Sequence, residues 1–412
     1  MNAGWKTIFR MVTRIRLIVC IGLLCLGAGN AMAQTSVAEF RKFLNEKGAF
    51  DETDFAALER DGPVVRLSPV SDKREVAVVG VVNIRANADE FLRSYLDGMT
   101  RKNNAAILEI GSFAKQPSLV DLQNLTIEAR DIEDLKECVV GDCQVKLSAA
   151  MIERFRNEIN WQAADYSSNA ANLYKQLLLD YVRDYQNRGQ AALIAYNDKR
   201  NEINLAAEQR TLDAGASYIN EILAGQQSEL RLIEDAIVWS KIKFGLKPVT
   251  AINHVTIYRR ERGVGPEVVV ASRQIYANHY FNASLALTAF VTVPNASQGA
   301  YLVYENRSRA DGLEGPFSRI KRGVVEKKAV EGLRAILEHS KTRFDGPALS
   351  ATTAEFSPHQ SYGWRQRLFG GIRPLLWLLV LSALIALFVL GRLRAENGTA
   401  RRKTLKPESA KS

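Results

Sequence analysis

Four runs of strand-favouring residues, separated by short turns, decide how this chain folds: VTAINHVTIYRR (249–260), EVVVASRQIYANHYF (267–281), SLALTAFVTV (284–293) and AYLVYENR (300–307). Valine, isoleucine, threonine and aromatic residues predominate in them, and these residue types favour strands. The links between the runs are too short to contain a crossover helix, so they favour antiparallel hairpins. The sequence therefore predicts an antiparallel β-meander over residues 249–307.

Helix and strand patterns flank the meander on both sides. After it, residues 317–343 place apolar side chains at helical spacing, which predicts one long closing helix. Well before it, residues 34–147 mix helical segments with strands, among them 75–84 (EVAVVGVVNI) and 105–113. We therefore predict an α+β fold in which an antiparallel sheet packs against a long C-terminal helix.

Between these two parts, residues 148–246 have helical periodicity throughout. Ser148 is placed to cap the first helix, and the last expected helix covers residues 228–244. The apolar pattern follows neither a sustained heptad nor a fixed repeat, which disfavours a coiled coil and a solenoid. The sequence predicts a large all-α insert here, followed by the antiparallel sheet and its closing helix over residues 247–344.

The first 33 residues have the three parts of a secretory signal. Positive residues precede a short apolar run, Ile18–Leu26, and Ala31–Ala33 forms an A-x-A cleavage site. An uncleaved anchor is the alternative, but the run is shorter than the ~20 residues that a membrane span requires. We therefore expect cleavage after residue 33 and export of the body.

Near the other end, residues 372–391 contain PLLWLLVLSALIALFVL, a run of uncharged residues that predicts a transmembrane helix. A buried core helix is the alternative. The segment 345–371 is expected to tether the body to this helix, and residues 392–412 form a basic cytoplasmic tail. Three arginines just before the apolar run are expected at the membrane surface: Arg365, Arg367 and Arg373.

The formal net charge of +10 is unevenly distributed along the chain. The signal contributes four positive residues and the tail a net +5, which leaves +1 for residues 34–391. A nearly neutral body argues against a nucleic-acid partner. Because the chain also lacks a dense cysteine framework, we expect a single-pass protein of a bacterial inner membrane, with its body in the periplasm.

Cys138 and Cys143 are the cysteines that remain after signal cleavage. They flank a Gly-Asp turn, and in an oxidising compartment they are predicted to close a small disulfide loop. A redox centre is a more specific alternative, but the spacing of the two cysteines is not C-x-x-C. A metal site would need two further ligands, and no histidine is nearby in the sequence.

Two histidines in the predicted strands are candidates for contact with a ligand. In IYANHYF, strict alternation would place Tyr276 and Tyr280 on one face and His279 on the other, apolar face. His254 and Tyr258 share a face of the first strand of the meander. On a cavity wall such polar atoms orient a ligand head group; hydrogen-bonded core histidines are the alternative. The sequence contains no recognisable catalytic, cofactor or metal motif.

The order of elements over roughly residues 64–343 resembles the helix-grip (START-like) fold. This resemblance implies a curved antiparallel sheet that wraps the last helix, with an apolar cavity between them for lipids, sterols or other hydrophobic ligands. The helical insert departs from the usual pattern. The segment Cys138–Cys143, followed by Val145-Lys-Leu, also resembles uncharacterised exported bacterial proteins, a similarity that implies no activity.

We therefore expect a membrane-anchored periplasmic binding protein for a lipid or other hydrophobic ligand. The alternative is a non-catalytic envelope interaction or assembly protein that uses the helical insert as its partner surface. An enzyme is the third and least favoured class, and no cofactor is expected.

Overall fold

The computed structural model describes residues 37–60, 62–99, 107–216, 230–243, 247–260, 267–292, 299–313 and 318–346. These residues form a large antiparallel sheet and several helices, which confirms the predicted α+β class. The expected signal peptide, the apolar run 372–391, its flanking arginines and the basic tail lie outside the described residues, as does all of the tether beyond residue 346. Among the described helices, none is long and apolar enough to cross a membrane.

The main sheet has eight strands in the order β1-β2-β10-β9-β8-β7-β6-β3, and every neighbouring pair is antiparallel. Strands β6 to β10 follow one another in sequence and in space, as a meander does. β10 also pairs with β2, which joins the two ends of the domain. The strands are β1 Val64–Leu67, β2 Glu75–Ile84, β3 Ile107–Ser112, β6 Leu230–Ile242, β7 Val249–Arg260, β8 Val268–Ala277, β9 Phe281–Thr292 and β10 Ala300–Ala310.

The run 267–281 does not form a single alternating strand, so the alternation predicted for IYANHYF is wrong. Tyr276 pairs with Ile252 and Gln274 with Asn253, which leaves Ile275 as an extra residue on β8. This irregularity puts Ile275 and Tyr276 into the same core cluster. β8 then ends at Ala277, and the following turn includes Tyr280 at a φ of 67°.

Two helices, α4 (Ala88–Gly98) and α10 (Ser318–Asp345), pack on one face of the sheet. Asn87 and Glu90 form a capping box at the start of α4, which fixes where that helix begins. Phe91 of α4 stacks on Phe290 of β9 with ring centroids 5.3 Å apart. We call this side of the sheet the α10 face.

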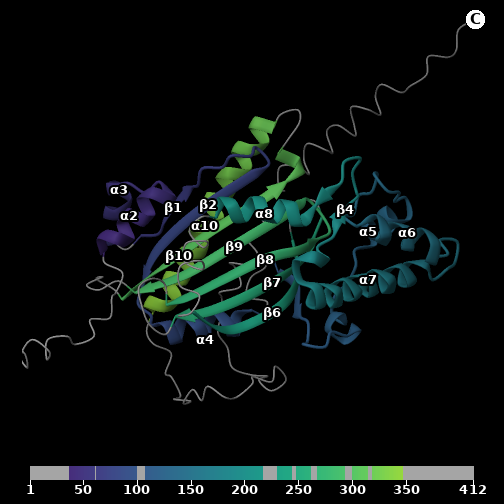
Figure 1. Cartoon of the computed structure of the whole chain (residues 1–412), viewed down its shortest axis with the longest axis horizontal. Helices are drawn as coiled ribbons and strands as arrows, with labels where there is room; N and C mark the ends of the chain where they lie inside the picture. The colour runs from purple at the N-terminus through teal and green to yellow at the C-terminus, as the bar shows by residue number, and fades with distance from the viewer. Residues whose placement is uncertain are drawn as a thin grey trace, which may run out of the picture.

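The remaining helices cover the opposite face, which we call the α7 face. Figure 1 shows α2 (Val37–Gly48) and α3 (Glu52–Glu59) at one end of the sheet, and α5 to α7 at the other. The helices at that other end are α5 Ala129–Lys136, α6 Ala149–Glu158 and α7 Tyr166–Arg188, and α8 Leu205–Gly215 lies across the strands. The sheet is therefore the middle layer of three.

The helical insert is shorter than the sequence predicted. Ser148 caps α6 as expected, but the two-residue strands β4 (Ala195–Tyr196) and β5 (Ile203–Asn204) interrupt the helices. The expected helix over 228–244 is wrong, because Leu230–Ile242 is strand β6. Both faces of β6 are buried from Ala236 onward, and periodicity does not distinguish such a run from a buried helix.

Candidate functional site

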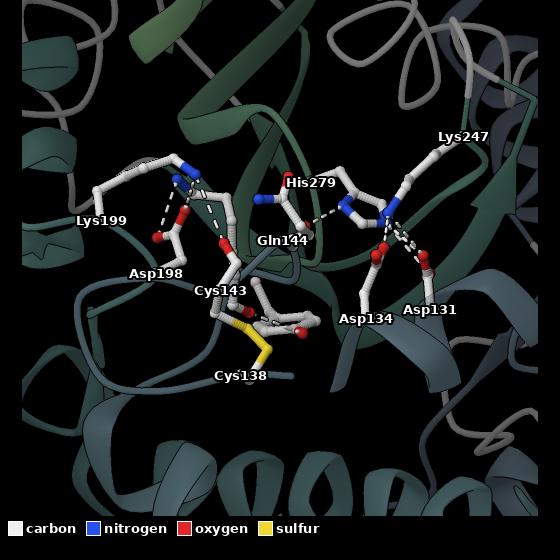
Figure 2. The surroundings of a disulfide bond; sticks show 11 residues. Asp131, Asp134, Cys138, Cys143, Gln144, Asp198, Lys199, Lys247 and His279 are labelled. Atoms are coloured by element: carbon white, nitrogen blue, oxygen red, sulfur yellow. Dashed lines mark hydrogen bonds and ion pairs between the residues drawn. A yellow bond between two sulfur atoms is a disulfide. The ribbon is translucent and has the colours of Figure 1, made fainter. Parts of the chain in front are cut away.

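His279 lies at the junction between the sheet and the helices of the α7 face. It belongs to the turn between β8 and β9, and only 3% of its surface is exposed. Its Nε2 atom is 3.1 Å from both carboxylate oxygens of Asp131, in the first turn of α5, and its Nδ1 atom is 3.1 Å from the carbonyl oxygen of Gln144 (Figure 2). Both partners can only accept hydrogen bonds, so an imidazole with two N–H groups satisfies both contacts.

Asp131 is the centre of this polar group. It also accepts a hydrogen bond from Asn278 Nδ2 at 3.2 Å, and Lys247 Nζ lies 3.4 Å from its Oδ1 atom. Lys247 pairs in addition with Asp134, one turn further along α5. Burial alone would raise the pKa of Asp131, but its hydrogen bond to His279 and the charges of His279 and Lys247 outweigh burial and lower it.

The predicted disulfide between Cys138 and Cys143 is present, with both cysteines 2% exposed. Cys143 N–H donates to Asp198 O at 3.0 Å, and Lys199 Nζ lies 3.5 Å from Cys143 O. Figure 2 shows Gln144 between this Asp198–Lys199 side and the His279 side. The disulfide therefore fixes the start of the segment 144–146, which His279 contacts.

Tyr276 holds the other end of the same segment. Its hydroxyl donates to Lys146 O at 3.1 Å and lies 2.8 Å from the hydroxyl of Tyr174 on α7. Complete burial raises the pKa of Tyr276 well above its ordinary range. Tyr276 and His279 thus lie close together, but both are used to attach the segment 144–146 and α7 to the sheet.

The other three candidate residues lie elsewhere. His254 and Tyr258 share one face of β7, as predicted, and both are partly buried. His254 contacts Tyr185 Oη through Nδ1 at 2.9 Å and Asp235 through Nε2 at 2.6 Å. Tyr280 packs instead against the core of the α10 face. The five sequence candidates therefore do not converge on one cavity.

A small hollow opens beside the His279 group. It is lined by residues that include Asp131, Tyr174, Lys241, Thr250 and Asn278, and it leaves essentially no space even for a water molecule. Ligand pockets usually enclose roughly 300–1,000 Å³, so this hollow cannot hold a lipid or a cofactor.

The chemistry available to His279 is limited in this arrangement. A general base needs a free ring nitrogen within reach of its substrate, and both nitrogens of His279 face internal acceptors. Within the described ranges, no group of three or more His, Cys, Asp or Glu side chains could hold a metal ion. The cluster is best described as a polar anchor between the helices and the sheet.

Sequence reasoning missed a second polar group, on the α10 face. It runs across the four adjacent strands β7 to β10, and each member is at most 9% exposed. We call it the polar strip, and its members are Asn253, Ser272, Gln274, Ser284, Asn306 and Ser308. Strand alternation puts these residues on the same side as Val255, Val270, Ala286 and Tyr304, which belong to the α10-face core.

Contacts within the strip confirm this placement. Ser284 Oγ and Ser308 Oγ are 3.0 Å apart, and Ser308 Oγ donates to Asn306 Oδ1 at 3.0 Å. The pattern in FNASLALTAF could have indicated the strip, because it puts polar residues on alternate positions; YENRSRA could not, because residues 305–309 are all polar. An alternating polar residue is expected on a face exposed to solvent. These polar residues are unusual only because the structure shows that both faces of the sheet are covered.

A comparison with protein-family models finds no match to this chain. Comparisons with curated proteins and with solved structures find none either. What the chain does must therefore be inferred from its own geometry.

Proposed function

We propose that the chain is a binding protein for a lipid or other hydrophobic ligand, held between the sheet and α10 and anchored to a bacterial inner membrane. The polar strip carries this proposal. Six buried neutral polar side chains interrupt a face whose neighbouring residues are apolar, such as Val255, Val270 and Phe290. An apolar wall with a few placed polar groups is the usual composition of a small-molecule site.

The arrangement of the elements supports the same proposal. β6 to β10 form a meander, and the chain then passes directly into α10, which buries Val325, Leu333 and Leu337 against the sheet. The helix-grip resemblance implies this relation between an antiparallel sheet and the last helix, with the ligand between them. Under this proposal the helices of the α7 face stiffen the sheet from behind.

The ligand is testable by recovery from the protein. The full chain, expressed in a bacterium and purified in detergent, is extracted with organic solvent, and its lipids are compared by mass spectrometry with those of the whole membrane. We expect one class of lipid to be enriched. The matched variant Ala286→Phe fills the α10 face at a buried position of β9 and should lose the enrichment. A lipid profile equal to that of the bulk membrane would overturn the proposal.

The proposed topology has a separate test. A reporter enzyme that is active only in the periplasm should be active when fused after residue 346 and inactive when fused after residue 412. Activity at both positions would contradict a membrane-spanning segment between them.

One observation favours the alternative, an envelope interaction protein. Val139 and Val140, inside the disulfide loop, are 44% and 45% exposed. The loop is held in place by the disulfide and by hydrogen bonds such as Gly141 N–H to Asn197 O at 2.8 Å. Two fixed, exposed valines offer an apolar contact to a protein partner. Crosslinking in intact cells that disappears in Val139→Asp, while lipid recovery stays unchanged, would favour this function over the first.

A further inference from the structure

The polar strip carries no charge. Its members are three amides and three hydroxyls on four adjacent strands. Two pairs face each other directly across the ladder, Asn253 with Gln274 and Ser284 with Ser308. The strip is therefore a continuous polar band across the centre of the sheet, bordered on the same face by apolar residues.

The chain places its charges on the other side of the same strand. On β10, Glu305, Arg307 and Arg309 alternate with Asn306 and Ser308, so they point to the α7 face. Arg309 Nε lies 2.6 Å from Glu208 of α8, and Arg307 Nε lies 2.8 Å from Glu75 of β2. Buried ions on β10 are thus neutralised on the α7 face, and the residues of β10 that alternate with them on the α10 face, Leu302, Tyr304, Asn306 and Ser308, are neutral.

Gln274 Nε2 has no hydrogen-bond partner among the described residues, whereas the Asn306 side chain interacts with the hydroxyl of the neighbouring Tyr304. Gln274 is 2% exposed and Asn306 is 3% exposed. Asn306 Oδ1 accepts from Ser308 Oγ, and the main-chain carbonyl of Gln274 accepts from Gln209 Nε2 at 2.7 Å. A buried donor without an acceptor lowers stability, so such donors are exceptions in a folded protein and need an explanation.

We propose that the polar strip recognises the uncharged head group of a neutral lipid, whose carbonyl or hydroxyl oxygen accepts from Gln274 Nε2. This inference rests on the proposed lipid-binding function and specifies the class of lipid. A phosphate would bring a negative charge next to side chains that include no cation, and burying an unpaired charge is far more costly than burying a hydroxyl. The hydroxyl and ester oxygens of a diacylglycerol match the donors and acceptors of the strip.

Two probes that differ only in the phosphate test the inference. The full chain in detergent is irradiated with a photoactivatable dioleoylglycerol or with the corresponding photoactivatable phosphatidic acid, and the crosslinked peptides are mapped by mass spectrometry. We expect dioleoylglycerol to label peptides of β7 to β10 or α10 at least tenfold more than phosphatidic acid does.

Two variants and one control link this labelling to the strip. Gln274→Leu and Gln274→Glu remove the donor, and each should reduce dioleoylglycerol labelling by roughly tenfold, the effect of losing a single hydrogen bond in a buried site. The melting temperature of Gln274→Leu should not fall, because the leucine replaces an unpartnered donor. The control is Gln209→Leu on the opposite face, which removes a formed hydrogen bond and should lower the melting temperature while labelling persists.

The outcomes separate this inference from the function on which it rests. Equal or stronger labelling by phosphatidic acid at the same peptides would leave the binding function intact and overturn the preference for a neutral head group. Labelling by neither probe, together with no lipid enriched on extraction, would overturn both. A melting temperature that falls by several degrees in Gln274→Leu would assign the amide a structural role and would also overturn the inference.

Discussion

His279 and Asp131 form a buried pair across 148 residues of sequence, with the imidazole Nε2 3.1 Å from each carboxylate oxygen. His279 comes from the turn between β8 and β9, and Asp131 comes from the first turn of α5. The pair therefore joins the sheet to the helices of the α7 face. Its strength should depend on the ionisation of Asp131.

We expect the His279–Asp131 pair to make part of the free energy of unfolding sensitive to acid. The pKa of Asp131 is lowered in the folded protein, because its partners outweigh the effect of burial. Its contribution is therefore complete above the unfolded value of about 3.9 and is lost as the pH falls through the lowered folded value. Urea unfolding should find Asp131→Asn less stable than the parent chain at pH 6, and the difference should shrink at lower pH.

The exposed Asp180 provides the control for this experiment. It lies 3.4 Å from Arg154 on the surface, and replacing it with asparagine should change stability little at either pH. A difference between the parent chain and Asp131→Asn that stays constant down to about pH 2 would contradict the assigned role of the carboxylate.

The disulfide predicts a modest and measurable stabilisation. Closing so short a loop restricts the unfolded chain by about 2 kcal/mol, and the folded bond also fixes Gln144, the partner of His279. The double variant Cys138→Ser/Cys143→Ser should unfold at a lower urea concentration, and dithiothreitol should lower the parent chain to the same midpoint. Dithiothreitol should leave the double variant unchanged. A parent chain that is insensitive to reduction would contradict this prediction.

Local signals in the sequence predicted those elements whose pattern is set by their immediate neighbours. β2 and β7 have the predicted bounds, Ser148 caps α6, and the cysteines pair across their turn. In each case short-range chemistry decides the outcome: β-branched residues between turn residues, an oxygen at a helix start, or two thiols close in sequence.

Features that depend on distant packing were not predictable in the same way. β6 was predicted as a helix because both of its faces are buried, and only its pairing with β3 and β7 makes it a strand. The extra residue at Ile275 moves Tyr276 to the α7 face, so its role follows from the register with β7. Recognising the polar strip required knowing which residues of four different strands lie on the same face of the sheet.

A buried ionic group under α8 predicts a large loss of stability on mutation. Arg309 is 1% exposed and lies between Glu208, at 2.6 Å, and Asp72, at 2.7 Å. Replacing it with leucine removes the most buried cation of the group, while Arg74 still contacts both carboxylates. We therefore expect a loss near the lower end of the about 3–5 kcal/mol that breaking a buried pair costs. Urea or thermal unfolding of Arg309→Leu measures the loss.

The exposed pair of Arg188 and Asp184 on α7 is the comparison for Arg309. Arg188→Leu should leave the unfolding midpoint almost unchanged, because water solvates the remaining carboxylate. Equal losses in the two variants would mean that burial does not set the energy of the Arg309 group.

The absence of a side chain at Gly80 allows α10 to approach β2 closely. A Cβ atom at this position of β2 would lie 2.6 Å from Leu337 Cδ1 and 2.9 Å from Leu333 Cδ2. Gly80→Val should therefore push α10 away from β2 and reduce the free energy of unfolding by about 1–3 kcal/mol, as overpacking of a core does. If the ligand lies between the sheet and α10, lipid recovery should change as well.

Gly323 gives the matched glycine control, on α10 itself. No atom lies within 4 Å of a Cβ built there, and the residue is inside the helix. Gly323→Ala should raise the free energy of unfolding by up to about 1 kcal/mol, because alanine favours a helix and glycine does not. If the free energy of unfolding falls in Gly80→Val and rises in Gly323→Ala, the close contact at Gly80, and not the loss of a glycine, sets the position of α10. A Gly80→Val chain as stable as the parent would contradict the close packing of α10 on β2.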